Sequence, residues 1–300
     1  MEYPEVSIII LNWNGIEDTI ECIESLKNIN YQEYKIIVVD NGSSENEGQV
    51  LKAKFGDYID IIRNERNYGY AEGNNIGIRY VLNKSMPEYI LLLNNDTVVH
   101  PRFLNELIDI AEQDSATGVA GPKTYYYDNA MELQFVATKV NLWTGWINHI
   151  GVGEIDSGQY NTIRDTDYCQ GSCFLIKQEV IQTIGLLDSA YFAYWEETDY
   201  CRRAHKAGFR IVYCPDAQIW HKTPQTGYEA NAIYYLTRNR FLFMRKHAGK
   251  LQILTFLLYY FSFRFILFTG HFLVRRKSLK SFKSFLRGVK DGVQLLFTGT

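Results

Sequence analysis

Two short stretches of the sequence combine the side chains that metal binding and proton transfer require. Residues 94–96 read Asn-Asn-Asp and follow directly on the apolar run 90–93. Residues 196–199 read Glu-Glu-Thr-Asp, so that three carboxyl groups fall within four positions. Carboxylate oxygens bind hard divalent cations, and a carboxylate within reach of a hydroxyl can accept its proton. The two stretches therefore hold side chains of the kinds that cation binding and proton transfer use.

The elements that would position these groups alternate along the first half of the chain. Short apolar runs rich in β-branched residues predict buried strands, and the segments between them carry the spacing of amphipathic helices. Such alternation indicates an α/β fold in which a mostly parallel sheet is flanked by helices. The predicted strands span 6–11, 35–40, 59–63 and 89–94, and the predicted helices span 17–29, 72–82 and 101–113.

Polar side chains stand at or just beyond the ends of several of these strands. Asn12, Asp40 and Asp96 all occupy such positions. Because ligands of parallel sheets bind beyond the carboxyl ends of the strands, we expect the three to line one crevice. Each of them taken alone could instead cap a helix or a turn, which is a common position of Asn and Asp.

A glycine-rich stretch after the third strand offers further contacts to a ligand. Glycine lets the backbone approach a ligand closely, and the side-chain amides nearby can hydrogen-bond to it. The stretch does not match G-x-G-x-x-G, so it carries no dinucleotide fingerprint. The candidates for contacts with a bound ligand are Asn12, Asp40, Asn67, Gly69, Asn74 and Asn95.

The acidic stretch opens a predicted helix over 196–208. In that helix Glu196 and Asp199 share a face, and Arg203 can pair with Asp199 one turn later. Glu197 points about 100° away from Glu196 around the helix axis. An acidic first turn that complements the helix dipole explains part of this pattern.

The chain around this helix is less regular. Aromatic residues and glycines dominate 124–168, and the runs 169–176 and 209–215 then read as strands, the second stopped by Pro215. His221 follows beyond that proline. A single histidine is usually structural, but here it is a candidate metal ligand because it could complete the acidic rim.

The C-terminal part combines an apolar run with basic residues. The run 251–274 is long enough to span a bilayer, but Arg264 near its middle costs roughly 2.5–3.5 kcal/mol there. We expect helices that lie on an anionic membrane surface, with a helix packed over the domain or a spanning helix as alternatives. The basic residues are Arg275, Arg276, Lys277, Lys280, Lys283, Arg287 and Lys290, interleaved with Phe282, Phe285, Leu286 and Val289 at helical spacing.

The cysteine content and the N-terminal sequence bear on the cellular location of the protein. The 5 cysteines are an odd number in a chain of 300 residues, so we expect them in the core rather than in a disulfide framework. The N-terminus lacks the features of a signal peptide. These observations predict a cytoplasmic location on the inner face of the cell membrane, and the interleaved phenylalanines favour a membrane over nucleic acid as the partner of the basic residues.

A series of motifs between about residues 4 and 248 resembles family 2 glycosyltransferases, above all the rhamnosyltransferase-like enzymes of polysaccharide assembly. The resemblance implies the GT-A fold and inverting transfer from a nucleotide sugar. It also implies a domain over 1–228, with a nucleotide-sugar half to about 122 and an acceptor half over 123–228, followed by a helical region over 229–300. The motifs are VSIIILNWNG, IIVVDNGSS, NYGYAEGNN, ILLLNNDTVV, YWEETDYCRRAHKAG and YYLTRNRFLFMRKH.

The resemblance also implies roles for the candidate residues. Asp40 matches the aspartate that recognises the base or ribose of the donor, and Asn12 matches a position beside the base. Residues 94–96 match the metal-binding D-x-D, of which only the last aspartate is present. His221 matches a second metal ligand of some members. Glu197 matches the catalytic base, which is more commonly Asp.

The expected substrates follow from the same resemblance. The donor is dTDP-rhamnose in first place and a UDP-sugar in second, with Mn2+ or Mg2+ as the cation. The acceptor is a hydroxyl of a lipid-linked saccharide. A UDP-hexose-dependent transferase of the same family and a non-catalytic sugar- or nucleotide-binding module remain as alternatives.

Overall fold

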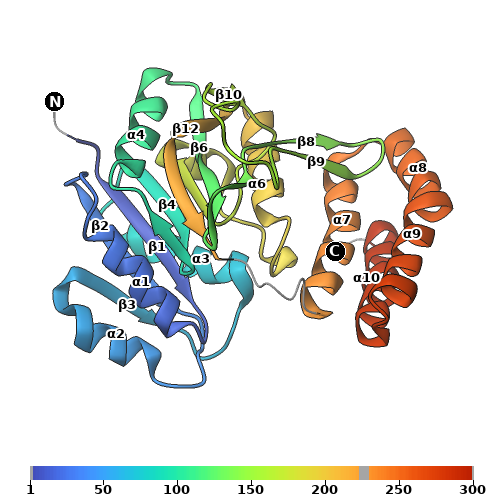
Figure 1. The fold of residues 1–300 in the computed structure, drawn as a ribbon, viewed down its shortest axis with the longest axis horizontal. Coiled ribbons are helices and arrows are strands. Elements are labelled where there is room, and N and C mark those ends of the chain that lie inside the picture. The colour runs from blue at the N-terminus through green and yellow to red at the C-terminus, as the bar shows by residue number, and fades with distance from the viewer. Residues whose placement is uncertain (1–2, 223–229, 299–300) are drawn as a thin grey trace.

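A mixed sheet of ten strands forms the centre of the computed structural model, which describes residues 3–222 and 230–298 (Figure 1). Along the sheet the order is β10 (Arg164–Asp165), β12 (Arg210–His221), β6 (Thr117–Tyr126), β11 (Cys173–Lys177), β4 (Tyr89–Asn94), β1 (Val6–Asn12), β2 (Tyr34–Asp40) and β3 (Ile59–Arg63). In addition, β5 (Thr97–Val99) pairs with β12, and β7 (Asn129–Phe135) pairs with β6.

The first four strands are parallel, as predicted, and their bounds agree with the prediction to within one residue. Helices cover both faces of this part of the sheet, which is why its central strands are almost uninterrupted apolar runs. Strand β11 is antiparallel to both of its neighbours, β4 and β6. Beyond it β6 and β12 pair in parallel again, as the first four strands do. The helices are α1 (Ile16–Leu26), α2 (Glu47–Phe55), α3 (Gly69–Lys84), α4 (Phe103–Gln113), α5 (Gln178–Ile184) and α6 (Glu196–Lys206).

Several predicted boundaries are wrong, among them the end of the helix predicted over 17–29, which ends at Leu26, and the start of the strand predicted over 169–176, which begins at Cys173. Strand β12 does not stop at Pro215 but continues to His221, because a register shift between Cys214 and Gln218 accommodates a residue that has no backbone N–H. Helix α3 begins at Gly69, three residues before the predicted start at residue 72. The five cysteines are buried and unpaired, as predicted.

A separate hairpin reaches from the sheet toward the C-terminal helices (Figure 1). It consists of β8 (Ala137–Asn141) and β9 (Trp146–Ile150). Its turn packs tightly there, since a Cβ on Gly145 would lie 2.8 Å from the Phe256 ring. The hairpin therefore links the region of the sheet to the helices that follow it.

The chain beyond residue 229 is helical, as predicted, and packs as a group of its own at one end of the molecule (Figure 1). Helix α10 lies so close to α7 that a Cβ on Gly292 would be 2.6 Å from the Phe241 ring. The group consists of α7 (Ala230–His247), the continuous helical segment α8 (Lys250–Tyr259), η3 (Tyr260–Arg264), α9 (Phe265–Gly270) and η4 (His271–Arg275), and α10 (Leu279–Phe297).

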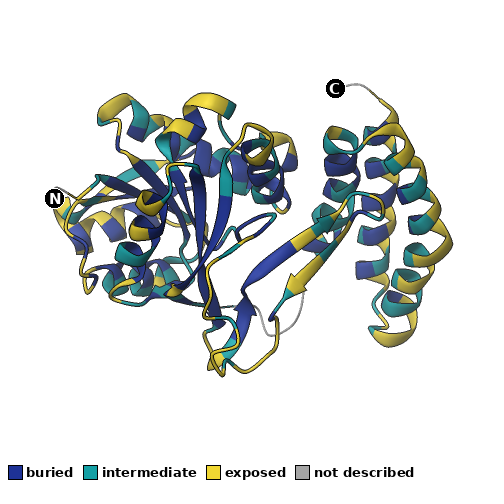
Figure 2. Cartoon of the chain, turned by 90° about the horizontal axis from the view of Figure 1, so that it is seen from above, coloured by how far each residue is buried: buried dark blue, intermediate teal, exposed yellow. Residues whose placement is uncertain are grey.

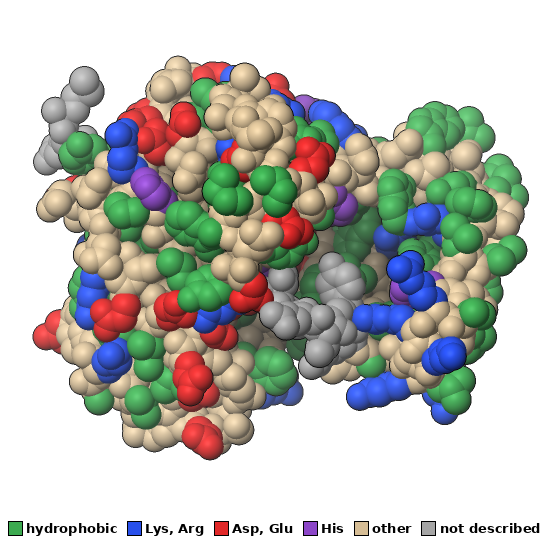
Figure 3. Space-filling model, in the orientation of Figure 1, with side chains coloured by type: hydrophobic (Ala, Val, Ile, Leu, Met, Phe, Trp, Pro, Cys, Tyr) green, Lys and Arg blue, Asp and Glu red, His purple; other side chains and the backbone are tan. Residues whose placement is uncertain are grey.

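This C-terminal helical group buries one face and exposes the other (Figure 2), and the buried side chains form an apolar cluster. Phe285 and Val289 are buried on the inner face of the group. The segment Lys250–Arg275 is long and apolar enough to cross a membrane by length and composition, and only 11% of its most apolar stretch is buried. Figure 3 shows hydrophobic, Lys and Arg side chains next to one another on this end of the molecule.

Candidate active site

Asp96 and His221 come together at the edge where β4 and β12 end. Oδ1 of Asp96 lies 3.0 Å from Nε2 of His221, although it is buried and takes part in no hydrogen bond. Gln134 of β7 lies behind the imidazole, with its Oε1 2.6 Å from Nδ1 of His221. The carbonyl oxygen of Gln134 is fixed as an acceptor, because its Nε2 donates to the backbone oxygen of His221.

This arrangement fits a cation. Since Gln134 accepts the proton of Nδ1, the Nε2 of a neutral His221 carries a lone pair that faces the Asp96 carboxylate. Two such acceptors at this distance repel each other unless a proton or a metal ion lies between them. Within 3–222 and 230–298, no group of three or more His, Cys, Asp or Glu side chains could hold a metal, so a bound ion would need oxygens from water or a ligand.

Asp40 also presents an unused carboxylate oxygen. Its Oδ1 accepts from the backbone N–H of Ser43 at 3.0 Å, whereas its buried Oδ2 accepts no hydrogen bond, and Nε of Arg63 is 3.8 Å away. A side chain on Gly48 would crowd this oxygen, because its Cβ would lie 3.2 Å from Oδ2. Such an orphaned acceptor is rare in a folded protein and fits a missing donor from a ligand.

The amides of Asn12 and Asn95 are already engaged by protein groups. Asn12 donates to Glu47 at 2.7 Å and accepts from Thr19 at 2.8 Å, entirely within the core. Asn95 donates to the same threonine at 3.0 Å and to the backbone oxygen of Gly15 at 3.2 Å. Both residues thus fix the start of α1 against the sheet edge, and a direct contact to a ligand would have to replace one of these bonds.

The remaining donor candidates support the turn that leads into α3. Oδ1 of Asn67 accepts from the N–H of Gly69 at 2.7 Å, and Nδ2 of Asn74 donates to a backbone oxygen inside the helix. The sequence reasoning missed Asn41, whose amide bonds to Asn64, Asn67, Tyr68 and Gly69 and holds the whole turn. Gly69 has a φ of +85°, and a Cβ there would lie 2.5 Å from the backbone oxygen of Phe192.

The two glutamates at the start of α6 differ in exposure. Glu196 is buried, and burial followed by the charge of Glu197 raises the pKa of Glu196 well above its usual range. Glu197 is partly exposed, and burial raises its pKa to about 7 against the opposing effect of backbone N–H groups. Only Glu197 is therefore placed to exchange a proton with a molecule bound at the surface near neutral pH.

Tyr70 connects the two carboxylate groups of the site. Burial and then the charges of Glu196 and Glu197 raise the pKa of Tyr70 well above its usual range, and Asp96 contributes to the same shift. Its hydroxyl donates to the backbone oxygen of Gly171. The charges of the acidic pair and of Asp96 thus all act on the Tyr70 phenol.

Comparison with known proteins decides the family. The model of "Glycosyl transferase family 2" matches residues 7–185, which is more than half of the chain. The chain belongs to glycosyl transferase family 2. The match contains Asp40 and Asp96, whereas Glu197 and His221 lie beyond its end.

Relatives of this glycosyltransferase include both hexosyl- and rhamnosyltransferases. It is 30% identical over 79% of its length to the low-salt glycan biosynthesis hexosyltransferase Agl10 of Haloferax volcanii, covering 75% of that protein. It is 31% identical over 72% of its length to the rhamnosyltransferase WbbL of Escherichia coli, covering 83%. It is 22% identical over 71% of its length to the N-acetylglucosaminyl-diphospho-decaprenol L-rhamnosyltransferase of Mycobacterium tuberculosis, covering 76%.

A solved structure shows the same fold. The crystal structure of GalNAc-T7 with UDP, GalNAc and Mn2+ superposes with a TM-score of 0.65 at 13% identity. The superposition covers 90% of this chain and 58% of that one. The expected GT-A-like architecture of the glycosyltransferase is thus confirmed, while the identity is too low to carry any functional residue.

The turn before α6 is held in an unusual backbone conformation. Phe192, Tyr194 and Trp195 have φ values of +63°, +68° and +79°, which cost free energy in residues other than glycine. Asn239 of α7 holds this turn, because its Nδ2 lies 2.7–2.8 Å from three backbone oxygens, those of residues 191, 193 and 194. The sequence reasoning missed this residue, although it lies in the motif YYLTRNRFLFMRKH.

Asp199 of α6 forms a second contact with α7. Arg203 donates to its Oδ2 at 2.8 Å, and Lys246 and His247 contact its Oδ1 at 2.5 and 2.8 Å. Burial alone would raise the pKa of Asp199, but the hydrogen bond from His247 and the charges of Arg203 and Lys246 lower it below its usual range. The predicted pair of Asp199 and Arg203 is confirmed, and Asp199 is a structural anchor.

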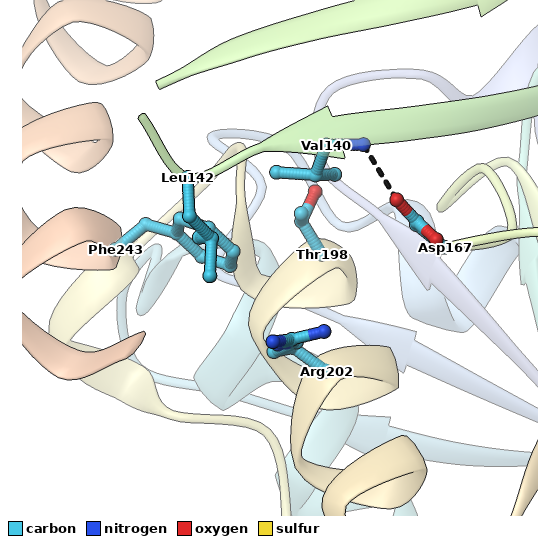
Figure 4. A pocket seen from close by; sticks show the side chains of 6 residues that line it. All are labelled: Val140, Leu142, Asp167, Thr198, Arg202 and Phe243. Atoms are coloured by element: carbon cyan, nitrogen blue, oxygen red, sulfur yellow. Dashed lines mark hydrogen bonds between the residues drawn. The ribbon is translucent and has the colours of Figure 1, made fainter. Parts of the chain in front are cut away.

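A small pocket is lined by residues of α6, the β8–β9 hairpin and α7 (Figure 4). Thr198 and Arg202 of α6 face the hairpin residues Val140 and Leu142 across it, and Phe243 closes it from α7. Arg202 thus points toward this packing contact, not toward Glu196. The pocket is too small for a sugar and belongs to the contact between α6, the hairpin and α7.

We predict that Asn239→Ala impairs transfer while donor binding survives. Loss of the amide leaves three backbone oxygens without their donor, which destabilises the fold by about 1–3 kcal/mol, and it lets the strained turn relax. The pKa of Glu197 should then fall, so that half-maximal transfer moves to lower pH. The measurement is transfer rate against pH, together with thermal unfolding.

Two variants control this experiment. Asn239→Asp keeps the shape of the side chain but has no N–H to donate, so it should fail as well. Asn231→Ala removes an exposed asparagine from the same helix and should change nothing. A normal pH profile in Asn239→Asp would show that the amide does not position the base.

Proposed function

We propose that this glycosyltransferase transfers a sugar with inversion from a nucleotide-sugar donor to a hydroxyl of a lipid-linked saccharide, with Glu197 as the general base. The observation that carries the proposal is the contrast within the acidic pair. Glu197 is partly exposed with a pKa of about 7, and its neighbour Glu196 is buried. A base whose pKa lies near the working pH is the most effective kind.

A single displacement is sufficient for this chemistry. Glu197 accepts the proton of the acceptor hydroxyl while the hydroxyl oxygen attacks the anomeric carbon. The nucleoside diphosphate leaves from the opposite face of the sugar, so the configuration at this carbon inverts. No second carboxylate nucleophile is required, which agrees with a neighbouring Glu196 that is buried inside the protein.

The sheet edge would bind the donor. Oδ2 of Asp40, which accepts no hydrogen bond from the protein, is suited to a donor group of the base or ribose. Asp96 and His221 would hold a divalent cation, and such a cation neutralises the charge of a leaving diphosphate. A histidine ligand favours Mn2+ over Mg2+, and GalNAc-T7, which shares the fold, has been crystallised with Mn2+.

The relatives guide the proposal for the two substrates. Two of the three relatives named above are rhamnosyltransferases, which supports rhamnose as the transferred sugar, with a hexose as the second candidate. The name of the M. tuberculosis relative includes a diphospho-decaprenol, which supports a lipid-linked acceptor. The exposed apolar and basic C-terminal helices support a peripheral position on the inner face of the cell membrane.

We predict that Glu197→Gln lowers the transfer rate by about 10²–10⁴-fold and leaves donor binding nearly unchanged, because it keeps the shape but cannot accept a proton. In the wild type the base must be ionised. Since its pKa is raised to about 7, the rate should fall as the pH drops below 7. The measurement is single-turnover transfer between pH 5 and pH 9.

Two further variants test the assignment of the base. Glu197→Asp restores the more common residue of the family with a shorter reach and should keep part of the activity. Glu196→Gln should retain transfer, since Glu196 is buried. A dead Glu196→Gln beside an active Glu197→Gln would shift the base by one residue, and two fully active variants would remove the base from α6.

We predict that dTDP-rhamnose with Mn2+ raises the thermal unfolding midpoint more than UDP-glucose with Mn2+, because a ligand that binds the native state stabilises it. Asp96→Ala should abolish the metal-dependent part of this protection, and His221→Ala should weaken it less, because water can replace one ligand. If Mn2+ increased the protection of Asp96→Ala as much as it increases that of the wild type, the metal site would be contradicted. Stronger protection by UDP-glucose would favour the hexose.

We predict that the basic face of α10 strengthens membrane binding. Lys280→Glu combined with Lys283→Glu should weaken sedimentation with phosphatidylglycerol vesicles, because each lysine near an anionic surface contributes about 1 kcal/mol. Binding of the wild type should fall as salt rises. Lys52→Glu combined with Lys54→Glu changes the same charge on α2 and serves as the control. Binding that resists both the α10 variant and salt would indicate an inserted helix instead.

A further inference from the structure

Two arginines in the C-terminal helical group have no acidic partner among the described residues. Nη1 of Arg240 and Nε of Arg264 are buried and donate no hydrogen bond. The ionisable groups that act on Arg240 are the phenols of Tyr259 and Tyr260 and the guanidinium of Arg264 itself. Burial and then the Arg264 charge lower the pKa of Arg240, and within 3–222 and 230–298 no carboxylate is among the groups that act on it.

The two guanidinium groups share one aromatic ring. The central carbon of Arg264 lies 3.5 Å from the centre of the Trp146 ring, and that of Arg240 lies 5.4 Å from the same centre. Trp146 stands in the hairpin strand β9 and is 38% exposed. Solvent therefore reaches the array, which consists of Arg240, Arg264 and Trp146, from one side. Arg264 ends the π-helical turn η3, an irregularity that often marks functional sites.

The array lies between the catalytic helix and the apolar face of the C-terminal helical group. On one side Arg240 stacks on Trp195 at 5.5 Å, and Trp195 is the residue before α6, two positions ahead of Glu197. On the other side Arg264 lies 5.1 Å from the Phe268 ring. The exposed side chains Phe261, Phe263 and Leu267 continue this apolar surface.

A guanidinium group that buries a nitrogen without a hydrogen-bond partner costs free energy, and two such groups side by side cost more. Cation–π contacts with Trp146 offset only about 0.5–2 kcal/mol of that cost. Arginine nitrogens that lack a partner are suited to phosphate, whose oxygens accept two parallel hydrogen bonds from one guanidinium. The array thus has the chemistry of a phosphate site with a sugar-transfer base on one side and an apolar surface on the other.

We propose that Arg240 and Arg264 bind the phosphate groups of the lipid-linked acceptor, an inference that rests on the proposed function. The saccharide then extends past Trp195 to Glu197, and the lipid chain runs over the exposed apolar face of α8 and α9. This arrangement brings the acceptor hydroxyl to the base from the side of the C-terminal helical group, while the donor occupies the sheet edge.

Binding is tested first without any transfer. Farnesyl diphosphate in detergent is titrated into the full-length protein by calorimetry with EDTA present, so that no metal site contributes. Arg240→Gln and Arg264→Gln should each weaken its affinity roughly 10- to 100-fold, as expected for lost charge-assisted hydrogen bonds. Arg102→Gln removes an exposed arginine at the start of α4 and should bind normally. Unchanged affinity in both variants would overturn the proposal.

Kinetics then separate this site from the catalytic one. Arg264→Gln should raise the KM for a lipid-linked acceptor roughly 10- to 100-fold, with kcat and thermal protection by the donor close to wild type. Arg264→Lys keeps the charge but not the bidentate geometry, so its KM should lie between those of the wild type and Arg264→Gln. This variant also decides the matter if Arg264→Gln unfolds, since a folded Arg264→Lys with the wild-type KM would overturn the proposal.

A third arm identifies the source of the phosphate. Inorganic diphosphate should compete with farnesyl diphosphate, and phosphatidylglycerol vesicles should not, if the site recognises the acceptor. Competition by the vesicles alone would assign the arginines to membrane headgroups and overturn the proposal. Arginine-dependent binding of farnesyl diphosphate in a protein that transfers no sugar would uphold this site and contradict the proposed function instead.

Discussion

The strained turn from Tyr191 to Trp195 and its attachment to Asn239 is the constraint on which the site depends. Three residues of this turn have positive φ, and one buried amide on α7 bridges its backbone oxygens. Immediately after it, α6 begins with the acidic pair, and Asp199 anchors the same helix to α7 through Lys246 and His247. Helix α7 of the C-terminal group therefore helps to hold the candidate site in place.

This attachment explains how two adjacent glutamates come to have different environments. The turn fixes the direction in which α6 starts, and this direction buries Glu196 against the protein while Glu197 keeps access to solvent. Burial is the common cause of their raised pKa values, and the charge of Glu197 adds to the rise at Glu196. The favourable contacts of Asp199 and Asn239 offset the cost of holding this pair in position.

The sequence predicts those features that depend on local patterns. The strands β1, β2 and β4 are buried on both faces, so their apolar runs are continuous and easily read. Helix α2 was not predicted, since only Leu51 and Phe55 among its apolar residues are buried. The long strand β12 contradicts the rule that proline ends a strand, because a bulge outside the reach of local patterns accommodates Pro215.

Supporting residues were harder to predict than the residues they support. Asp96 and His221 stand out by type and position, whereas Gln134, which fixes the imidazole, lies 87 residues away from His221 in an irregular region. Asn239 is likewise 45 or more residues from the oxygens it holds. A glutamine or an asparagine in a polar stretch carries no signal of its own, since its role arises only when the fold brings distant backbone groups to it.

The sheet edge and the C-terminal helices carry side chains of different charge. The sheet edge gathers carboxylates and amides, which suit a cation and a nucleotide, whereas the C-terminal helices gather arginines and lysines next to exposed apolar side chains. In the proposed arrangement a diphosphate approaches α6 from each end, one in the donor and one in the acceptor. A metal ion would then compensate the charge of the donor diphosphate, which must leave its sugar. Arginines would compensate the charge of the acceptor diphosphate, which remains attached to its sugar.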